Sequence, residues 1–97
     1  MGSILGSVRT PDGDTVVLTV AVWDHILARH PEMDMHRGEI FETISSPHLV
    51  TEDPEAGRKR FYRSGVGPSR WLRVIVDFNQ RPARIISAFG IRKERPT

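Results

Sequence analysis

Cysteine is missing from this 97-residue chain, so the chain can form neither disulfides nor thiolate metal sites. Strong metal-ligand spacings are missing as well, because the four histidines and the carboxylates form neither HExxH nor a comparable pattern. We therefore expect no structural metal and no cofactor. A chain without cysteine is typical of a reducing compartment.

Long apolar runs are also missing. No stretch approaches the roughly 20 apolar residues of a membrane span, and residues 1–6 lack the basic and apolar regions of a signal peptide. We therefore predict a cytoplasmic protein that has no membrane partner. A hydrophobic content of 38% allows one modest core. The prediction is a single domain, 1–97, with 1–13 and 93–97 as flexible ends.

The two signs of charge are unevenly distributed along the chain. Residues 1–57 hold three basic and ten acidic residues, a formal −7, whereas residues 58–97 hold eleven basic and two acidic residues, a formal +9. Nine of those eleven are arginine, whose planar guanidinium grips phosphate in two places. The basic half indicates a polyanionic partner, nucleic acid first. The alternative is a solvated basic face, or one matched internally by the acidic half.

Hydrophobic periodicity predicts helices first and strands afterwards. A short strand over 15–20 leads into a helix over 20–30, and a second helix covers 35–46; a proline closes each helix. From residue 48 the period is two. The strands expected there are 48–51, 59–64, 70–78 and 83–89. This order indicates an α+β fold, with one or two N-terminal helices packed on a three- to four-stranded antiparallel sheet.

Alternation along 70–78 assigns the two faces of that sheet. One face carries Leu72, Val74, Val76 and Phe78 and is expected to meet the helices. The other carries Trp71 and Arg73 and is left for solvent or a ligand. The loop 79–82 leaves the register of the last hairpin open by one residue. A shift of one residue would move Ser87 to the opposite face.

Candidate residues for RNA cleavage lie in both halves of the chain. Cleavage without a metal needs a base for the 2′-OH proton, an acid for the leaving 5′ oxygen and cations for the phosphoryl charge. His25 and His30 lie on the first helix about 140° apart, so only one can serve a given face. The ordinary interpretations are a surface His25 and a half-buried His30. The sheet half adds Arg60, Tyr62, Arg73 and Ser87.

Further residues are candidates for RNA binding rather than chemistry. Trp71 can stack on an unpaired base, a contact of roughly 1–3 kcal/mol per base. The basic side chains near it can hold phosphates. The RNA-binding candidates are Arg29, Arg63, Arg70, Trp71 and Arg92.

Several short motifs occur in a suggestive order. They are 23–32 (WDHILARHPE), 44–47 (ISSP), 60–63 (RFYR), 71–76 (WLRVIV) and 84–89 (RIISAF). This order resembles the small phage- and toxin-associated nucleases grouped with the barnase, EndoU, colicin and RelE-type fold. Members carry HI…RHPE on an early helix and R-I-I-[ST]-A on the final strand. The resemblance spans about residues 18–92, although each motif alone is weak.

The resemblance implies a metal-independent endoribonuclease, either a toxin of a toxin–antitoxin pair or a phage-borne effector. It implies His25 or His30 as the general acid or base, Arg60 and Arg73 as phosphate ligands, and Ser87 as the polar residue of the last strand. The implied partners are RNA, whether mRNA on the ribosome, tRNA or free RNA, and a cognate antitoxin or inhibitor. The alternative function is a non-catalytic module that binds RNA or protein through the basic sheet face.

Overall fold

The computed structural model describes residues 3–95 and contains six strands, two α-helices and one 3₁₀ helix. The elements in chain order are β1 (Ile4–Arg9), β2 (Thr15–Thr19), α1 (Val20–Arg29), the 3₁₀ helix (Pro31–His36), α2 (Arg37–Ser45), β3 (Leu49–Glu52), β4 (Arg58–Ser64), β5 (Trp71–Asp77) and β6 (Ala83–Ile91). The α+β class predicted from the sequence is confirmed. Within residues 3–95 no helix is long and apolar enough to cross a membrane.

The sheet is larger than predicted, and it is mixed. Its strand order is β1-β2-β6-β5-β4-β3, and β2 runs parallel to β6 while the other neighbouring strands are antiparallel. The prediction of three or four antiparallel strands was therefore wrong. It missed β1, which lies inside the segment 1–13 that was assigned to a flexible end. Residues 1–2 and 96–97 of the two predicted ends lie outside the described residues.

Local chemistry favours both ends of α1. The Thr19 hydroxyl caps α1 by accepting a hydrogen bond from the Val22 N–H at 3.2 Å, and Pro31 follows the last turn. The second predicted helix, 35–46, is in fact divided. A 3₁₀ turn that begins at Pro31 precedes α2. Pro31 suits the first turn of a helix because its missing N–H would have no partner there.

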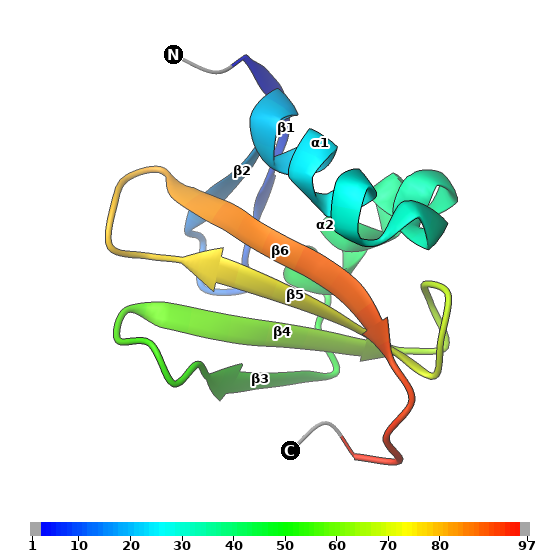
Figure 1. Cartoon of the computed structure of the whole chain (residues 1–97). Helices are drawn as coiled ribbons and strands as arrows, with labels where there is room; N and C mark the ends of the chain where they lie inside the picture. The colour runs from blue at the N-terminus through cyan, green and yellow to red at the C-terminus, as the bar shows by residue number, and fades with distance from the viewer. Residues whose placement is uncertain (1–2, 96–97) are drawn as a thin grey trace.

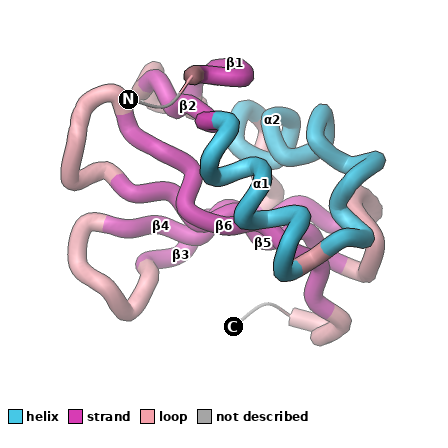
Figure 2. The backbone as a smooth tube through the Cα atoms, turned by 45° about the horizontal axis from the view of Figure 1, so that its top comes forward, coloured by secondary structure: helices cyan, strands magenta, loops and turns pink. Residues whose placement is uncertain are grey.

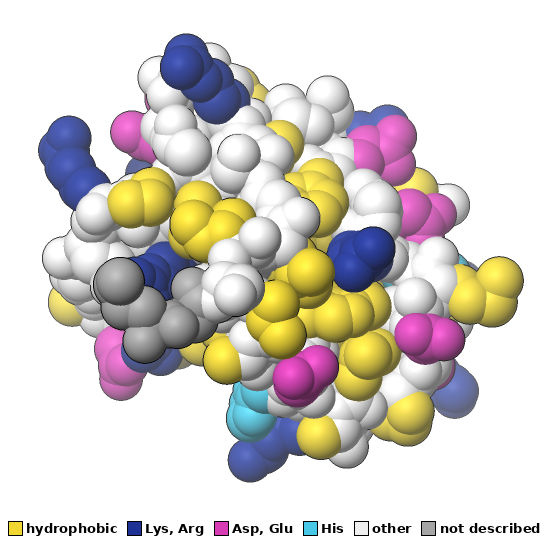
Figure 3. Space-filling model, turned by 90° about the horizontal axis from the view of Figure 1, so that it is seen from above, with side chains coloured by type: hydrophobic (Ala, Val, Ile, Leu, Met, Phe, Trp, Pro, Cys, Tyr) yellow, Lys and Arg dark blue, Asp and Glu magenta, His cyan; other side chains and the backbone are white. Residues whose placement is uncertain are grey.

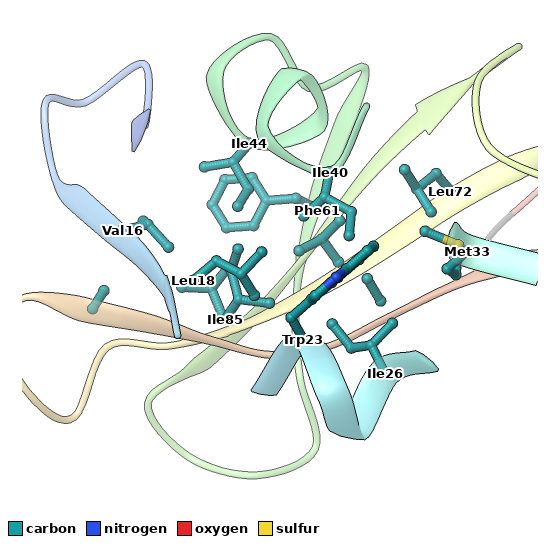
Figure 4. Close-up of a cluster of buried hydrophobic side chains, with 14 residues drawn as sticks. Val16, Leu18, Trp23, Ile26, Met33, Ile40, Ile44, Phe61, Leu72 and Ile85 are labelled. Atoms are coloured by element: carbon teal, nitrogen blue, oxygen red, sulfur yellow. The ribbon is translucent and has the colours of Figure 1, made fainter. Parts of the chain in front are cut away.

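One cluster of buried side chains joins the helices to the sheet. Trp23 and Ile26 of α1 point toward Ile40 and Ile44 of α2 and toward Leu72 of β5 (Figure 4). The alternation predicted for β5 is confirmed, because its inward residues are fully buried. Burying such side chains stabilises the fold by about 1.5–3 kcal/mol each.

The helices are not equivalent in position. α2 packs against β4 and β5 and covers one face of the sheet, whereas α1 contacts β6 and β2 and runs beside β6 (Figures 1 and 2). We call the face turned away from α2 the outer face.

The molecule seen from above shows apolar side chains gathered in the middle, with Lys and Arg lying singly around them (Figure 3).

We predict that Ile44→Ala destabilises the protein by about 2–5 kcal/mol, because Ile44 is fully buried in the cluster. Met35→Ala is the matched control, since Met35 is 90% exposed and surface changes stay within about 0.5 kcal/mol. Urea unfolding of both variants measures the difference. Equal midpoints for the two would contradict the placement of α2 on the sheet.

Candidate functional site

A β-bulge in β6 determines which residues share the outer face. Ser87 lies opposite Ile75, whereas Ile85 lies opposite Val76, so Ile86 has no partner on β5. The extra residue reverses the alternation along β6. Ile85 and Ala88 are therefore both buried in the core, while Ser87 and Phe89 are on the outer face. The register left open by the sequence is thus resolved: Ser87 shares the face of Arg73.

Arg73 is held in place by aromatic residues on both sides. Its Nε donates a hydrogen bond to the Tyr62 hydroxyl at 3.0 Å. The guanidinium carbon lies 5.3 Å from the centroid of the Tyr62 ring and 5.4 Å from that of Phe89. These are cation–π distances. Within residues 3–95 no carboxylate forms an ion pair with Arg73, so its charge remains available to an anion.

Tyr62 is fully buried, which limits its role. Its ring also meets Trp71 edge to face, with the centroids 6.5 Å apart. A side chain without exposed surface orients its neighbours and does not touch a ligand in this conformation. The hydroxyl therefore directs the Arg73 guanidinium.

His30 reaches the same place from the end of α1. Its ring stacks on Phe89 with the centroids 5.0 Å apart and the planes 21° apart. The side chain is 30% exposed, and Nδ1 lies 3.6 Å from the Glu32 carboxylate. His30, Phe89, Arg73 and Tyr62 thus form a continuous series of contacts across β6, β5 and β4, which we call the Arg73 row.

Arg60 lies on the same face but is already matched by an acid. Its Nε donates to the Asp53 carboxylate at 2.7 Å. Burial by itself raises the pKa of Asp53, but hydrogen bonds from the Glu55 N–H and Arg60, with the charges of Arg60 and Arg58, outweigh it and hold the pKa below its usual value. The same hydrogen bond raises the pKa of Arg60. Arg60 is therefore a weaker candidate for phosphate than Arg73.

The structure does not bring the other predicted residues into the Arg73 row. His25 and Arg29 are on the exposed side of α1. Arg63 faces α2, where it donates to the Ser46 carbonyl and lies 3.7 Å from Glu42.

The C-terminal segment engages two more of the predicted RNA-binding residues. The Trp71 indole donates to the Glu94 carbonyl at 3.1 Å, and Arg70 lies 3.7 Å from the Glu94 carboxylate. Arg92 lines a shallow pocket with Glu32, Pro68, Ser69 and Gly90. Trp71 also contacts Tyr62 of the row, whereas Arg70 and Arg92 engage residues outside it.

Two structural contributors could not be predicted from the sequence. Phe89 joins His30 to Arg73, but an apolar residue in a strand gave no sign of that role. Glu39 of α2 binds His36 and accepts the Gly67 N–H at 3.0 Å, which fixes the loop between β4 and β5. The hydrogen bond from His36 lowers the pKa of Glu39. The contacts of Phe89 and the hydrogen bond between Glu39 and Gly67 have no sequence signature.

No family model, curated protein or solved structure matches this chain. Among the described residues, no group of three or more His, Asp and Glu could hold a metal ion.

We predict that Asp53→Asn weakens the acid dependence of stability. The pKa of Asp53 is lowered in the folded state, so its stabilising contribution is complete above the unfolded value of about 3.9 and is lost as the pH falls through the folded pKa. Urea unfolding between neutral pH and about pH 3 should show a smaller loss for Asp53→Asn than for wild type. Asp12→Asn, at an exposed position, should leave the wild-type curve unchanged.

Proposed function

We propose that this protein is a metal-independent endoribonuclease whose site is the Arg73 row together with Ser87. The observation that carries the proposal is the setting of Arg73. Its guanidinium is oriented by a buried tyrosine, lies near two rings, and has no acid partner among residues 3–95. Such an arginine suits a phosphate, because an anion completes the charge that the fold leaves unmatched. A partly exposed histidine in the same series of contacts adds a group that can move a proton.

The proposed reaction is attack of a ribose 2′-OH on the adjacent phosphorus. The bond between phosphorus and the 2′ oxygen forms, and the bond to the 5′ oxygen breaks. His30 performs one of the two proton transfers, and the other falls to Ser87 or to water. Arg73 stabilises the negative charge that builds on the non-bridging oxygens. Arg60 is partly neutralised by Asp53 and supports the site from β4.

We expect His30→Ala and Arg73→Ala each to lower RNA cleavage in EDTA by about 10²-fold or more, as losses of proton transfer and of charge stabilisation do. His25→Ala should retain activity, because His25 is on the exposed side of α1. Arg37→Ala on α2 is the charge-matched control. Loss of cleavage in His25→Ala but not in His30→Ala would assign the chemistry to the other histidine and refute this site.

We expect Tyr62→Phe to lower cleavage by less than Arg73→Ala does. The substitution removes the hydroxyl that accepts from Arg73 Nε but keeps the buried ring and the guanidinium charge. Single-turnover rates and substrate affinity should be measured for both variants. If Tyr62→Phe were as inactive as Arg73→Ala while remaining folded, Tyr62 would be acting on the substrate and not through Arg73.

We propose that the nuclease acts as a toxin or a phage-borne effector. Its substrate is free RNA, tRNA or mRNA on the ribosome, and a cognate inhibitor would restrain it. Overproduction of wild type should arrest growth, and Arg73→Ala should not. RNA binding without cleavage, even with translating ribosomes present, would replace this proposal with the non-catalytic binding module.

A further inference from the structure

The arginines of the outer face fall into two groups. On β4, Arg58 lies 2.9 Å from Glu55 and Arg60 lies 2.7 Å from Asp53, so both charges are matched. Among the described residues, Arg73 on β5, Arg84 on β6 and Arg9 on β1 have no ion-pair partner. Arg84 and Arg9 are exposed. On the outer face, the arginines without an ion pair therefore lie on β5, β6 and β1, whereas those of β4 are matched.

Strand register shows that these three arginines share one face. Arg84 lies opposite Asp77, which is on the Arg73 side of β5. Across the parallel pair, Val17 lies opposite Arg84, and Thr15 has the same orientation as Val17. Arg9 lies opposite Thr15. The inward position of the neighbouring Val8, which packs against the core, agrees with this orientation.

The spacing suits a nucleic-acid strand. Four residues of β5 separate Arg73 from the position opposite Arg84, which is about 13 Å at ~3.3 Å per residue. Arg9 is two strands away from Arg84, at ~4.8 Å per strand, and it is displaced by two residues along the strand direction. These two displacements together place Arg9 roughly 12 Å beyond Arg84. A stacked strand advances about 3.4 Å per nucleotide. About eight stacked nucleotides therefore span the three arginines.

The surface between them carries hydroxyl groups and one carboxylate, that of Asp77. Ser7 and Thr15 are exposed on this face. Asp77 lies opposite Arg84, but it is only 9% exposed and accepts hydrogen bonds from the Asn79 N–H and side-chain amide. Asp14 is next to Thr15 and lines the groove that holds Lys59 and Phe78 on the other face.

We propose that single-stranded RNA leaves the Arg73 row across β6 and continues over β2 to β1, with phosphates bound by Arg84 and Arg9. We call Arg73, Arg84 and Arg9 the arginine track. The inference deepens the proposed function and rests on it for the position of the scissile phosphate. It gives the substrate a direction, toward β1 and away from the matched arginines of β4.

The test compares a long substrate with a short one. The affinity for a fully 2′-O-methylated single strand of about 12 nucleotides, which cannot be cleaved, is measured against salt concentration. Cleavage of a dinucleotide, which reaches only the Arg73 row, is measured separately. The proteins are wild type, Arg84→Gln, Arg9→Gln and the double variant. Arg58→Gln is the control on the same face, and Arg37→Gln is the control on α2.

Each track variant should lower the slope of log affinity against log salt by about 0.7, the value for one phosphate contact with a single strand. The double variant should lose about twice that, and both controls should keep the wild-type slope. Dinucleotide cleavage should be unchanged in the track variants. An unchanged slope in Arg84→Gln and Arg9→Gln, or an equal loss in Arg58→Gln, would overturn the track.

The two proposals fail separately. If wild type does not cleave the dinucleotide or any longer RNA but the track variants lose salt dependence as expected, the RNA path stands and the nuclease is refuted. If wild type cleaves RNA while the slopes of the track variants match wild type, the nuclease stands and the path is refuted.

Discussion

The single unpaired residue in β6 determines what the outer face can do. If Ile86 were paired regularly with β5 and no bulge were present, strict alternation from Ile85 would turn Ser87 and Phe89 into the core and Ala88 outward. The bulge keeps both ends of β6 packed, because Ile85 and Ala88 are buried on either side of it. It also sends Phe89 toward His30 and Arg73. Core packing and the Arg73 row therefore depend on the same local departure from regular pairing.

The charge of Arg73 is stabilised differently from the charges of the neighbouring arginines on β4. Arg60 and Arg58 are matched by carboxylates from the turn that joins β3 to β4, so they contribute to holding that turn on the sheet. Arg73 has only a hydroxyl and two rings as partners. A partly desolvated cation without a counter-ion is a liability for folding. The fold tolerates it with cation–π contacts, which preserve the positive charge where an acid would cancel it.

Local patterns predicted the parts of this fold that are made locally. The alternation of Leu72 with its neighbours defined both faces of β5, and the helix predicted over 20–30 is α1. The pairing of β2 with β6 joins segments more than sixty residues apart, and no local pattern shows it. Strand β1 was missed because Gly6 and Ser7 interrupt its apolar character. The sequence did not predict the bulge in β6; it left only the register of the last hairpin open by one residue.

The residue types of the candidate site could be predicted from the sequence, but their interaction partners could not. Arg73, Tyr62 and His30 could be selected because their chemistry suits phosphate and proton transfer, yet the sequence ranked Arg60 equally with Arg73. Asp53 decides between them, and it sits in an acidic turn whose approach to β4 depends on the hairpin. The opposite charges of the two halves of the chain thus have two consequences. Acids of the first half neutralise the arginines nearest their own strands, and the arginines beyond their reach keep the charge that an anion would meet.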